Sequence, residues 1–572
     1  MTRRKWAVLA IAVLLLVVGL RAATLQRAAF NWDEFALFDS VARTLSDGVL
    51  RSGGRPGLAQ LLVMPLVEGC RDEMAVGRSA RAIWLVVTLA SLVGLFVALA
   101  ELLRGRPHRY HDAALGVGLL ALLPVFLEWS IQVRTDQIAL LGATWGGVAL
   151  LRSERTPGLA LAAGLAFGIG WLGSQKLAYG ALLMALLAAG RLGVGATLVP
   201  RRETWRGLLV LAGFGTVLLC FRAFSMWLFT LPETHAAKNL VAPQLASARE
   251  VVFPFYRHTI GYGQYAAILP TLVPHLVLGA GLVAATVLAW REHRREGWLA
   301  LAWAVLALGA AVGLFHAAAF AYFWMTLGLF PAVAGALAIG PVRERLLASH
   351  PGWRRPLAVA FWIGLALPAI AAQGLLLRDT QAVQRQSLAF VHRNFAPSHE
   401  GFQPEGAVFC APPQPLGVWF SQTLYRRFEG PYREPQIARL KEHFRAKPVH
   451  YLVESFRLNQ FPLEVRRFWA EHYQPYRDSV FVAGRRVRGE RGEELELELI
   501  VSGPYRWLPR SADASLDVDG TPLAPGAVVE LSAGRHRARF PVVGGEGLLV
   551  LALRDAPASS PLPFYPPYGV SN

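Results

Sequence analysis

The sequence predicts a polytopic α-helical membrane protein with a water-soluble C-terminal region, on three observations. The chain has 572 residues, 54% of them hydrophobic and 17% charged, and its mean hydropathy of +0.37 lies outside the range of ordinary soluble domains. Apolar runs long enough to cross a hydrocarbon core of about 30 Å recur between residues 6 and 377. After residue 378 the composition changes to that of a soluble protein.

The apolar runs predict about 11 transmembrane helices, because each span needs roughly 20 apolar residues. The runs at 136–151 and 177–190 are short, so ten or twelve spans remain open. The predicted spans are 6–22, 82–103, 113–130, 136–151, 157–174, 177–190, 207–229, 267–290, 298–315, 317–340 and 357–377.

The basic residues predict topology rather than a nucleic-acid partner, although the net charge is +18. The basic clusters fall on one side of the membrane if the spans alternate, as the positive-inside rule requires. The clusters begin at Arg3, Arg104, Arg152, Arg201, Arg291 and Arg343. We therefore expect a multi-pass protein of the bacterial inner membrane, with a cytoplasmic N-terminus, a retained first helix and an extracytoplasmic C-terminal region.

The first external loop, 21–81, is long enough to carry short interfacial helices within the membrane domain of residues 1–377. Phe35, Phe38 and Val41 recur at helical spacing after the adjacent acids Asp33 and Glu34. This spacing predicts a helix in the headgroup plane with its apolar face toward lipid. Two interpretations of the acidic pair stay open, namely capping of this helix and chemistry.

Charged residues near the ends of membrane helices are functional candidates because burying charge there is costly. Several are predicted to meet at the external side, where a few polar groups in an apolar cleft can form an active site. For Arg78 and Lys176 the alternative is that a long side chain merely reaches the interface. The candidates are Asp33, Glu34, Arg55, Arg78, Arg134, Asp136 and Lys176.

The external region is predicted to comprise a small α/β domain, 378–490, and a β-sandwich with a Pro-rich tail, 491–572. Short β-runs at 449–453 and 479–483 mix with helical patterns at 435–444 and 463–472, whereas 494–499 alternates strictly. Tyr505 and Trp507 either stack on sugar rings or form core, and core is the simpler interpretation.

The three cysteines are too few for a disulfide framework. Cys220 lies in a predicted span, whereas Cys70 and Cys410 are both predicted outside. A bridge between these two is open, and two unrelated thiols is the simpler interpretation.

The order of several motifs in the first 340 residues resembles the polyprenyl-phosphate-sugar-dependent glycosyltransferases of the C-type superfold. Within that class the pattern is most similar to the protein O-mannosyltransferase and lipid A aminoarabinose transferase families. The matching motifs are Asp33-Glu34, Leu45-x-x-Gly48, Arg55-Pro56-x-Leu58, Pro65-Leu66, Gly77-Arg78-x-x-Arg81, Arg134-Thr135-Asp136, Gly168 to Lys176 and Tyr322 to Pro331. The chain departs from the pattern at Gly57, where a second proline is common, and its external region lacks the Trp-Trp-Asp signature of oligosaccharyltransferases, which argues against N-glycan transfer.

The resemblance implies a polyprenyl-phosphate-sugar donor in the membrane and an extracytoplasmic glycan, lipid or protein acceptor. Asp33 is then the general base for an inverting attack on the anomeric carbon, with Glu34 as its helper or as a ligand in the layer behind it. Preorganised cations would stabilise the departing phosphate. The residues that would bind the polyprenyl-phosphate donor are Arg55, Arg134, Lys176 and Tyr322.

The resemblance also raises a divalent cation, Mg²⁺, Mn²⁺ or Ca²⁺, because Asp136 can join Asp33 as an oxygen ligand. A salt bridge from Asp136 to Arg134 and a helix cap are the alternatives. Other functions stay open: an O-antigen ligase or polymerase, which tends to carry its key residues in a late loop, and a lipid-linked-sugar transporter or flippase, which predicts inverted repeats that we do not find.

Overall fold

The computed structural model describes the chain except for residues 1–11, 13–14, 17, 51–56, 155, 196–199, 231–268, 316–320, 377–380, 412–427, 429, 456, 559–563 and 565–572. Arg55, the N-terminal basic cluster and most of the Pro-rich tail therefore lie outside the described residues.

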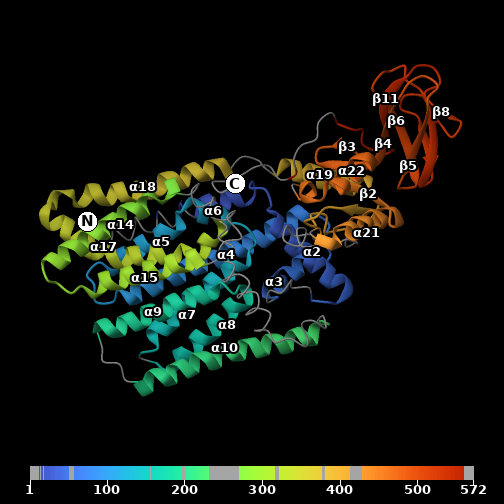
Figure 1. Cartoon of the computed structure of the whole chain (residues 1–572). Helices are drawn as coiled ribbons and strands as arrows, with labels where there is room; N and C mark the ends of the chain where they lie inside the picture. Colours follow the sequence, from blue (N-terminus) through green and yellow to red (C-terminus); the bar gives the residue numbers. More distant parts are fainter. Residues whose placement is uncertain are drawn as a thin grey trace.

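The described part of the chain consists of a helical body and a C-terminal region rich in strands, so the predicted class of fold is confirmed. Figure 1 shows the long helices of the body running roughly side by side, with the strands gathered beyond one end. The helices of the body are α4 (Glu73–Leu102), α5 (Arg109–Ala121), α6 (Pro124–Ser130), α7 (Thr135–Arg152), α8 (Gly158–Gly173), α9 (Leu177–Gly195), α10 (Pro200–Leu228), α14 (Val273–Arg291), α15 (Gly297–Phe315), α16 (Trp324–Leu327), α17 (Leu329–Ser349) and α18 (Arg354–Leu376). Short 3₁₀ turns precede α14, α16 and α18, at η1 (Leu269–Leu272), η2 (Ala321–Phe323) and η3 (Pro351–Trp353).

The chain is a multi-pass membrane protein. Among the described residues, six helical segments are long and apolar enough to cross a membrane, or seven if a bent pair is one span. Leu58–Val67, Gly158–Gly173 and Leu177–Arg191 are shorter apolar helices. The predicted number of about 11 spans is thus not confirmed, because several of the apolar runs form short helices.

The span predicted at 113–130 contains a sharp bend. Its two halves, α5 and α6, meet at an angle of 69°. Pro124 begins α6 and lacks the backbone N–H that would continue the hydrogen bonds of α5. The bend turns α6, with Trp129 near its end, out of the axis of α5.

Glycines bring α7 and α8 into close contact. A methyl group added at Gly142 of α7 would lie 2.6 Å from the Cα atom of Gly170 in α8, and one added at Gly173 would lie 2.5 Å from Cβ of Ile138. Small residues allow membrane helices to pack backbone against backbone in this way. The start of α7 and the end of α8, which carry polar residues, are consequently neighbours.

The first external loop contains α2 (Trp32–Asp47) and α3 (Leu58–Val67). The apolar face of α2 does not face lipid, contrary to the prediction of an interfacial helix. The Phe38 ring packs 5.2 Å from Phe409, and the Phe35 ring 5.8 Å from Phe564. This face of α2 therefore joins the core of the C-terminal region, because burying aromatic area between two protein segments removes it from water and lipid headgroups alike.

A disulfide between Cys70 and Cys410 joins the first loop to the C-terminal region, so the interpretation as two unrelated thiols is wrong. Glu73, next to this bridge, accepts hydrogen bonds from Nε2 of His392 at 2.9 Å and from the backbone N–H of Cys410 at 3.1 Å. The hydrogen bond to Glu73 raises the pKa of His392 above its ordinary value. The C-terminal region is thus fastened to the loop that carries α2.

The C-terminal region folds around two sheets. A seven-stranded sheet has the order β1-β2-β4-β11-β6-β9, with β3 also paired to β4, and a four-stranded sheet has the order β5-β10-β7-β8. The helices are α19 (Ala382–Asn394), α21 (Arg433–Ala446) and α22 (Leu463–His472), with 3₁₀ turns η4 (Gly430–Tyr432) and η5 (Leu458–Gln460). The strands are β1 (Glu400–Phe402), β2 (Val449–Val453), β3 (Tyr473–Arg477), β4 (Val480–Gly489), β5 (Glu494–Leu499), β6 (Gly503–Pro509), β7 (Leu516–Val518), β8 (Thr521–Leu523), β9 (Val528–Leu531), β10 (Gly534–Arg539) and β11 (Gly545–Leu551).

The larger sheet crosses the boundary drawn at residue 490 from the sequence. The beginning of β4 pairs with β2, and its later part pairs with β11 from Gly484 to Gly489. The two expected domains therefore share one sheet. Tyr505 and Trp507 of β6 are fully buried, so the interpretation of these aromatics as core is confirmed.

Candidate active site

The N-terminus of α2 separates the roles of its two acids. Asn31 caps the helix, since its side chain accepts a hydrogen bond from the Asp33 N–H at 3.0 Å, and Glu34 completes the capping box by accepting from the Asn31 N–H at 2.8 Å. Glu34 therefore points back into the protein. The side chain of Asp33, which is 26% exposed, is left on the open side of the helix.

Arg134 connects Asp33 to a second acid. It directly precedes α7, and its Nη2 donates to Oδ2 of Asp33 at 2.8 Å. Its Nε lies 3.9 Å from Oδ2 of Asp136 in the first turn of α7. The buried guanidinium of Arg134 thus faces two carboxylates, one at the start of α2 and one at the start of α7. The salt bridge between Asp136 and Arg134, an alternative left open by the sequence, is present.

Lys176 extends this arrangement from the loop after α8. Its Nζ lies 3.0 Å from Oδ1 of Asp136, and the same oxygen accepts from Oγ of Ser174 at 3.2 Å. The close packing of α7 on α8 brings these loops together. The result is a row of alternating charges, Asp33, Arg134, Asp136 and Lys176, which we call the charge row.

Two aromatic rings line the cations of the charge row. The Tyr322 ring lies 4.0 Å from Cζ of Arg134 and 4.4 Å from Nζ of Lys176. Trp129 of α6 lies 4.9 Å from the same guanidinium and packs edge-on against Tyr322, with ring centroids 5.6 Å apart. The π faces attract both cations and keep them beside each other despite their like charge.

A buried layer behind the charge row holds Arg134 in place. Arg81 of α4 donates to Glu34 through Nε at 2.8 Å and Nη2 at 2.6 Å. Oε1 of Glu34 also accepts from the backbone N–H of Val133 at 2.9 Å, and Nε1 of Trp84 donates to the carbonyl of Arg134 at 2.6 Å. Val133 and Arg134, the two residues before α7, are thus both held by hydrogen bonds to their backbone groups.

Five of the seven residues predicted from the sequence belong to this site directly: Asp33, Arg134, Asp136, Lys176 and Tyr322. Glu34 lies behind them with a fully buried side chain, so its geometry supports a positioning role rather than contact with reacting atoms. Arg55 lies outside the described residues. Arg78, named as an external charge, is instead 3.9 Å from Asp72 with 34% of its side chain exposed.

Sequence reasoning missed Trp129 and the partner role of Arg81. Trp129 lies five residues before Arg134, and an aromatic residue so close to a candidate cation is a usable signal. The pairing of Arg81 with Glu34 has no local signal, because 47 residues separate them.

The geometry does not fit a divalent cation between Asp33 and Asp136. The guanidinium of Arg134 faces both carboxylates, and Lys176 and Ser174 contact Asp136, so a bound cation would meet two positive charges. No group of three His, Cys, Asp or Glu side chains able to hold a metal occurs among the residues that the structure describes.

No family model matches the chain, and no curated protein matches it. Similar solved structures include the oligosaccharyltransferase AglB from Archaeoglobus fulgidus in complex with an inhibitory peptide and a dolichol-phosphate, at 11% identity over 96% of this chain and 97% of that one, with a TM-score of 0.47. ArnT from Cupriavidus metallidurans bound to undecaprenyl phosphate has 15% identity over 80% of this chain and 95% of that one, with a TM-score of 0.39. An Archaeoglobus fulgidus oligosaccharyltransferase in complex with Zn and sulfate has 10% identity over 95% and 98%, with a TM-score of 0.45.

Their identities to this chain are 10–15%, and their TM-scores all lie below 0.5. A likeness this distant says nothing about function, so the charge row has to carry the functional proposal.

Proposed function

We propose that this protein is an integral-membrane glycosyltransferase that moves a sugar from a polyprenyl-phosphate donor to an extracytoplasmic acceptor, with inversion at the anomeric carbon. The observation that carries the proposal is the charge row on its aromatic lining, where one partly exposed acid meets two cations. An acid beside paired cations suits a reaction in which a hydroxyl loses a proton while a phosphate departs.

The cations supply the phosphate site in this proposal. Arg134 and Lys176 are held by Tyr322 beneath them, and a phosphate has enough oxygens to accept hydrogen bonds from both. Preorganised cations in a site of low dielectric stabilise the charge that develops on a leaving group. Arg134 offers several N–H groups in a fixed plane, which suits phosphate recognition.

Asp33 is the general base. The acceptor oxygen attacks the anomeric carbon, its proton passes to the Asp33 carboxylate, and the bond from that carbon to the phosphate oxygen breaks, so the electron pair leaves with the polyprenyl phosphate. Asp33 accepts a hydrogen bond from Arg134. When the donor phosphate attracts Arg134, the carboxylate becomes available to the acceptor, which couples donor binding to base function.

The acceptor reaches the site from the side of the C-terminal region in this proposal. That region packs on α2, the helix whose first turn carries Asp33. This arrangement agrees with a bacterial inner-membrane protein whose N-terminus is cytoplasmic and whose C-terminal region is extracytoplasmic. The donor enters from the membrane between the helices of the body.

The decisive experiment compares Asp33→Asn with a control, Asp72→Asn, in purified protein reconstituted in lipid. Asp72 caps α4 in the same external loop but lies outside the charge row. We expect Asp33→Asn to lower the rate of sugar transfer from a polyprenyl-phosphate donor about 10² to 10⁴-fold, with donor affinity retained and thermal stability little changed, whereas Asp72→Asn keeps the rate. Equal rates for wild type and Asp33→Asn would refute the assignment of the base.

A further inference from the structure

Gln132 lies two residues before Arg134 and contacts the charge row without belonging to it. Its side-chain oxygen Oε1 accepts a hydrogen bond from Nη1 of Arg134 at 3.2 Å. A guanidinium carries N–H donors and no acceptor, so this contact fixes which end of the Gln132 amide faces Arg134. The NH₂ group of Gln132 is therefore at the end of the amide that faces away from the guanidinium.

Hydrogen bonds hold the backbone of Gln132 on both sides. Its N–H donates to the carbonyl of Trp129 at 3.4 Å, and its carbonyl accepts from Nε2 of Gln137, in the first turn of α7, at 2.7 Å. Gln132 is only 8% exposed, and Gln137 is fully buried. The backbone from which the Gln132 side chain extends is thus fixed, so its amide is preorganised beside Arg134.

The guanidinium of Arg134 is held at its edges as well as by the aromatic rings. Nη2 donates to Asp33 and Nη1 donates to Gln132, while Nε lies 3.9 Å from Oδ2 of Asp136. Each terminal nitrogen carries two hydrogens, and these contacts use one hydrogen of each. In the described part of the chain, one hydrogen of Nη1 and one of Nη2 therefore remain for a further acceptor.

The NH₂ group of Gln132 is a third donor of this kind. Its nitrogen, Nε2, donates to no residue that the structure describes, although the side chain is nearly buried. It keeps contact with solvent, whereas Oε1 of Gln137 behind it is buried without a partner. An amide donor without an acceptor in so enclosed a place costs free energy, and an acceptor that binds beside it removes this cost.

We propose that Gln132 donates a hydrogen bond to the phosphate of the polyprenyl-phosphate donor, while its carbonyl keeps Arg134 oriented toward the same phosphate. This inference rests on the proposed function, because it takes the charge row as the site of that phosphate. A phosphate has enough oxygens to accept from Gln132, Arg134 and Lys176 together. As a neutral donor, Gln132 adds a hydrogen bond without adding to the repulsion between the two cations.

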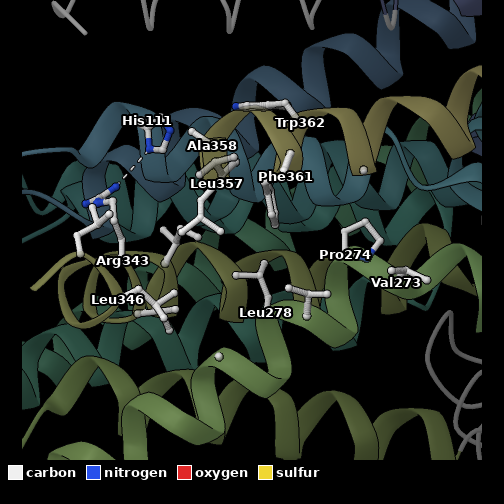
Figure 2. Close-up of a pocket in the computed structure, with 18 residues that line it drawn as sticks. His111, Val273, Pro274, Leu278, Arg343, Leu346, Leu357, Ala358, Phe361 and Trp362 are labelled. Atoms are coloured by element: carbon white, nitrogen blue, oxygen red, sulfur yellow. Dashed lines mark hydrogen bonds between the residues drawn. The ribbon is translucent and has the colours of Figure 1, made fainter. Parts of the chain in front are cut away.

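A second arginine with a neutral neighbour supplies a matched control. Figure 2 shows His111 beside Arg343 at one end of an apolar cavity between α14, α17 and α18, with Nη1 of Arg343 3.3 Å from Nδ1 of His111. Arg343 also donates to Asp112 at 2.6 Å, so its charge is balanced there. It lies roughly 20 Å along α17 from the start of that helix, which follows Tyr322, at about 1.5 Å per residue. His111→Leu thus removes a neutral neighbour from an arginine outside the charge row.

The test measures the affinity of the purified full-length protein in detergent for undecaprenyl phosphate, with undecaprenol as the ligand that lacks the phosphate. Gln132→Met has a similar length and no amide, whereas Gln132→Glu still offers Arg134 an oxygen but no N–H at neutral pH. We expect both variants to raise the Kd for undecaprenyl phosphate about tenfold, the typical effect of losing a hydrogen bond to a charged group. His111→Leu should keep the wild-type Kd, and the affinity for undecaprenol should be the same in all variants. High ionic strength screens the charge that Gln132→Glu adds.

Three outcomes would overturn the inference. Wild-type affinity in Gln132→Glu with a loss in Gln132→Met would mean that the side chain only orients Arg134. Wild-type affinity in both variants would mean that Gln132 does not contact the donor, and an equal loss of affinity for undecaprenol would assign the effect to the polyprenyl chain.

Lys176→Ala separates this inference from the proposed function. Weaker binding of undecaprenyl phosphate in Lys176→Ala but not in the Gln132 variants would refute the role of Gln132 and leave the phosphate site of the charge row in place. Wild-type affinity in Lys176→Ala as well would mean that the charge row does not bind the phosphate, so the proposed function would fail together with the inference.

Discussion

Arg81 donates two hydrogen bonds to the carboxylate of Glu34, at 2.8 Å and 2.6 Å, and neither side chain is exposed. The same carboxylate accepts from the N–H of Val133. One ion pair thus links α4, the first turn of α2 and the loop that delivers Arg134. Because a buried pair costs desolvation energy, its value to the protein lies in fixing the separation of Asp33 and Arg134.

The first prediction concerns this pair. Glu34→Gln should lower the free energy of unfolding by roughly 3–5 kcal/mol, because it leaves the buried guanidinium of Arg81 without a compensating charge. The double variant Glu34→Leu with Arg81→Met should recover only part of this loss, because it leaves the backbone N–H groups of Asn31 and Val133 without their acceptor. Thermal unfolding of Glu34→Leu, Arg81→Met and the double variant gives the coupling energy between the two side chains. A variant Glu34→Gln that keeps its stability but loses transfer as Asp33→Asn does would place Glu34 in the chemistry instead.

The second prediction tests whether Arg134 and Lys176 bind the donor phosphate, a role distinct from that of the general base Asp33. Lys176→Ala should raise the KM for the polyprenyl-phosphate donor about tenfold or more, since a hydrogen bond to a charged group is worth roughly 1.5–3 kcal/mol, and should leave the KM for the acceptor nearly unchanged. Arg134→Lys should act in the same direction, because an ammonium cannot match the planar fork of a guanidinium. Steady-state kinetics with each substrate varied in turn give both constants. A rise confined to the acceptor KM would move these residues to the acceptor site.

The third prediction concerns the bridge between Cys70 and Cys410, which are 340 residues apart in the chain. Removing a disulfide that closes so long a loop typically costs a few kcal/mol. Cys70→Ser should therefore lower the thermal midpoint and make the C-terminal region more sensitive to proteolysis, and reductant should do the same to wild type. Cys220→Ser is the control, because Cys220 is an exposed free thiol. Identical proteolysis of all three proteins would mean that the bridge does not fasten the region.

The fourth prediction concerns Glu405, which is fully buried beside Ser455 and Arg457. Burial raises the pKa of Glu405 to about 7. Between pH 4.5 and 7 the folded protein thus holds a proton that the unfolded chain has released, so stability contributed by this group is lost as the pH rises through that window. Above pH 7 the free energy of unfolding should be lower by about 3 kcal/mol than it would be if Glu405 kept its proton.

Glu405→Gln should remove this dependence, since the amide does not titrate. The thermal midpoint of the variant should rise relative to that of wild type as the pH increases from 5 to 8. Glu442→Gln, at an exposed position of α21, provides the control and should follow wild type. If the thermal midpoints of Glu405→Gln and wild type changed with pH in parallel, Glu405 would have an ordinary pKa in the folded protein.

The fifth prediction concerns metal. Because Arg134 faces both Asp33 and Asp136, sugar transfer should continue after exhaustive treatment with a chelator and should not increase when Mg²⁺, Mn²⁺ or Ca²⁺ is added. Rate measurements in chelator-treated buffer test this. A loss of activity that one of these cations restores would show that Arg134 moves aside for a metal in the working enzyme.

Local signals in the sequence predicted a large part of the structure. The strict alternation at 494–499 and the helical pattern at 463–472 form β5 and α22 with those bounds, because side-chain period and turn residues act over a few positions. The acidic pair at the start of α2 and the charged ends of α7 and α8 were also visible, since charge is conspicuous in an apolar chain. These local signals were sufficient to select Asp33, Arg134, Asp136 and Lys176 as candidate site residues.

The pairings within the site were decided by tertiary structure. Whether Asp33 or Glu34 faces Arg134 depends on the capping geometry of α2 and on Arg81, 47 residues away from Glu34. The contact of Lys176 with Tyr322 depends on how α8, α6 and η2 pack. Hydropathy and periodicity describe one helix at a time, so they carry no information on which helix ends meet.

The sequence by itself thus determined that this is a membrane protein, where most of its helices and strands lie, and which charged residues deserve attention. Only the tertiary structure decided that α2 faces protein rather than lipid, that Cys70 joins Cys410, and that Asp33 is the acid left on the open side of the site. The physical reason is that local patterns follow from the chain's own geometry, whereas these contacts arise from packing between segments far apart in the sequence.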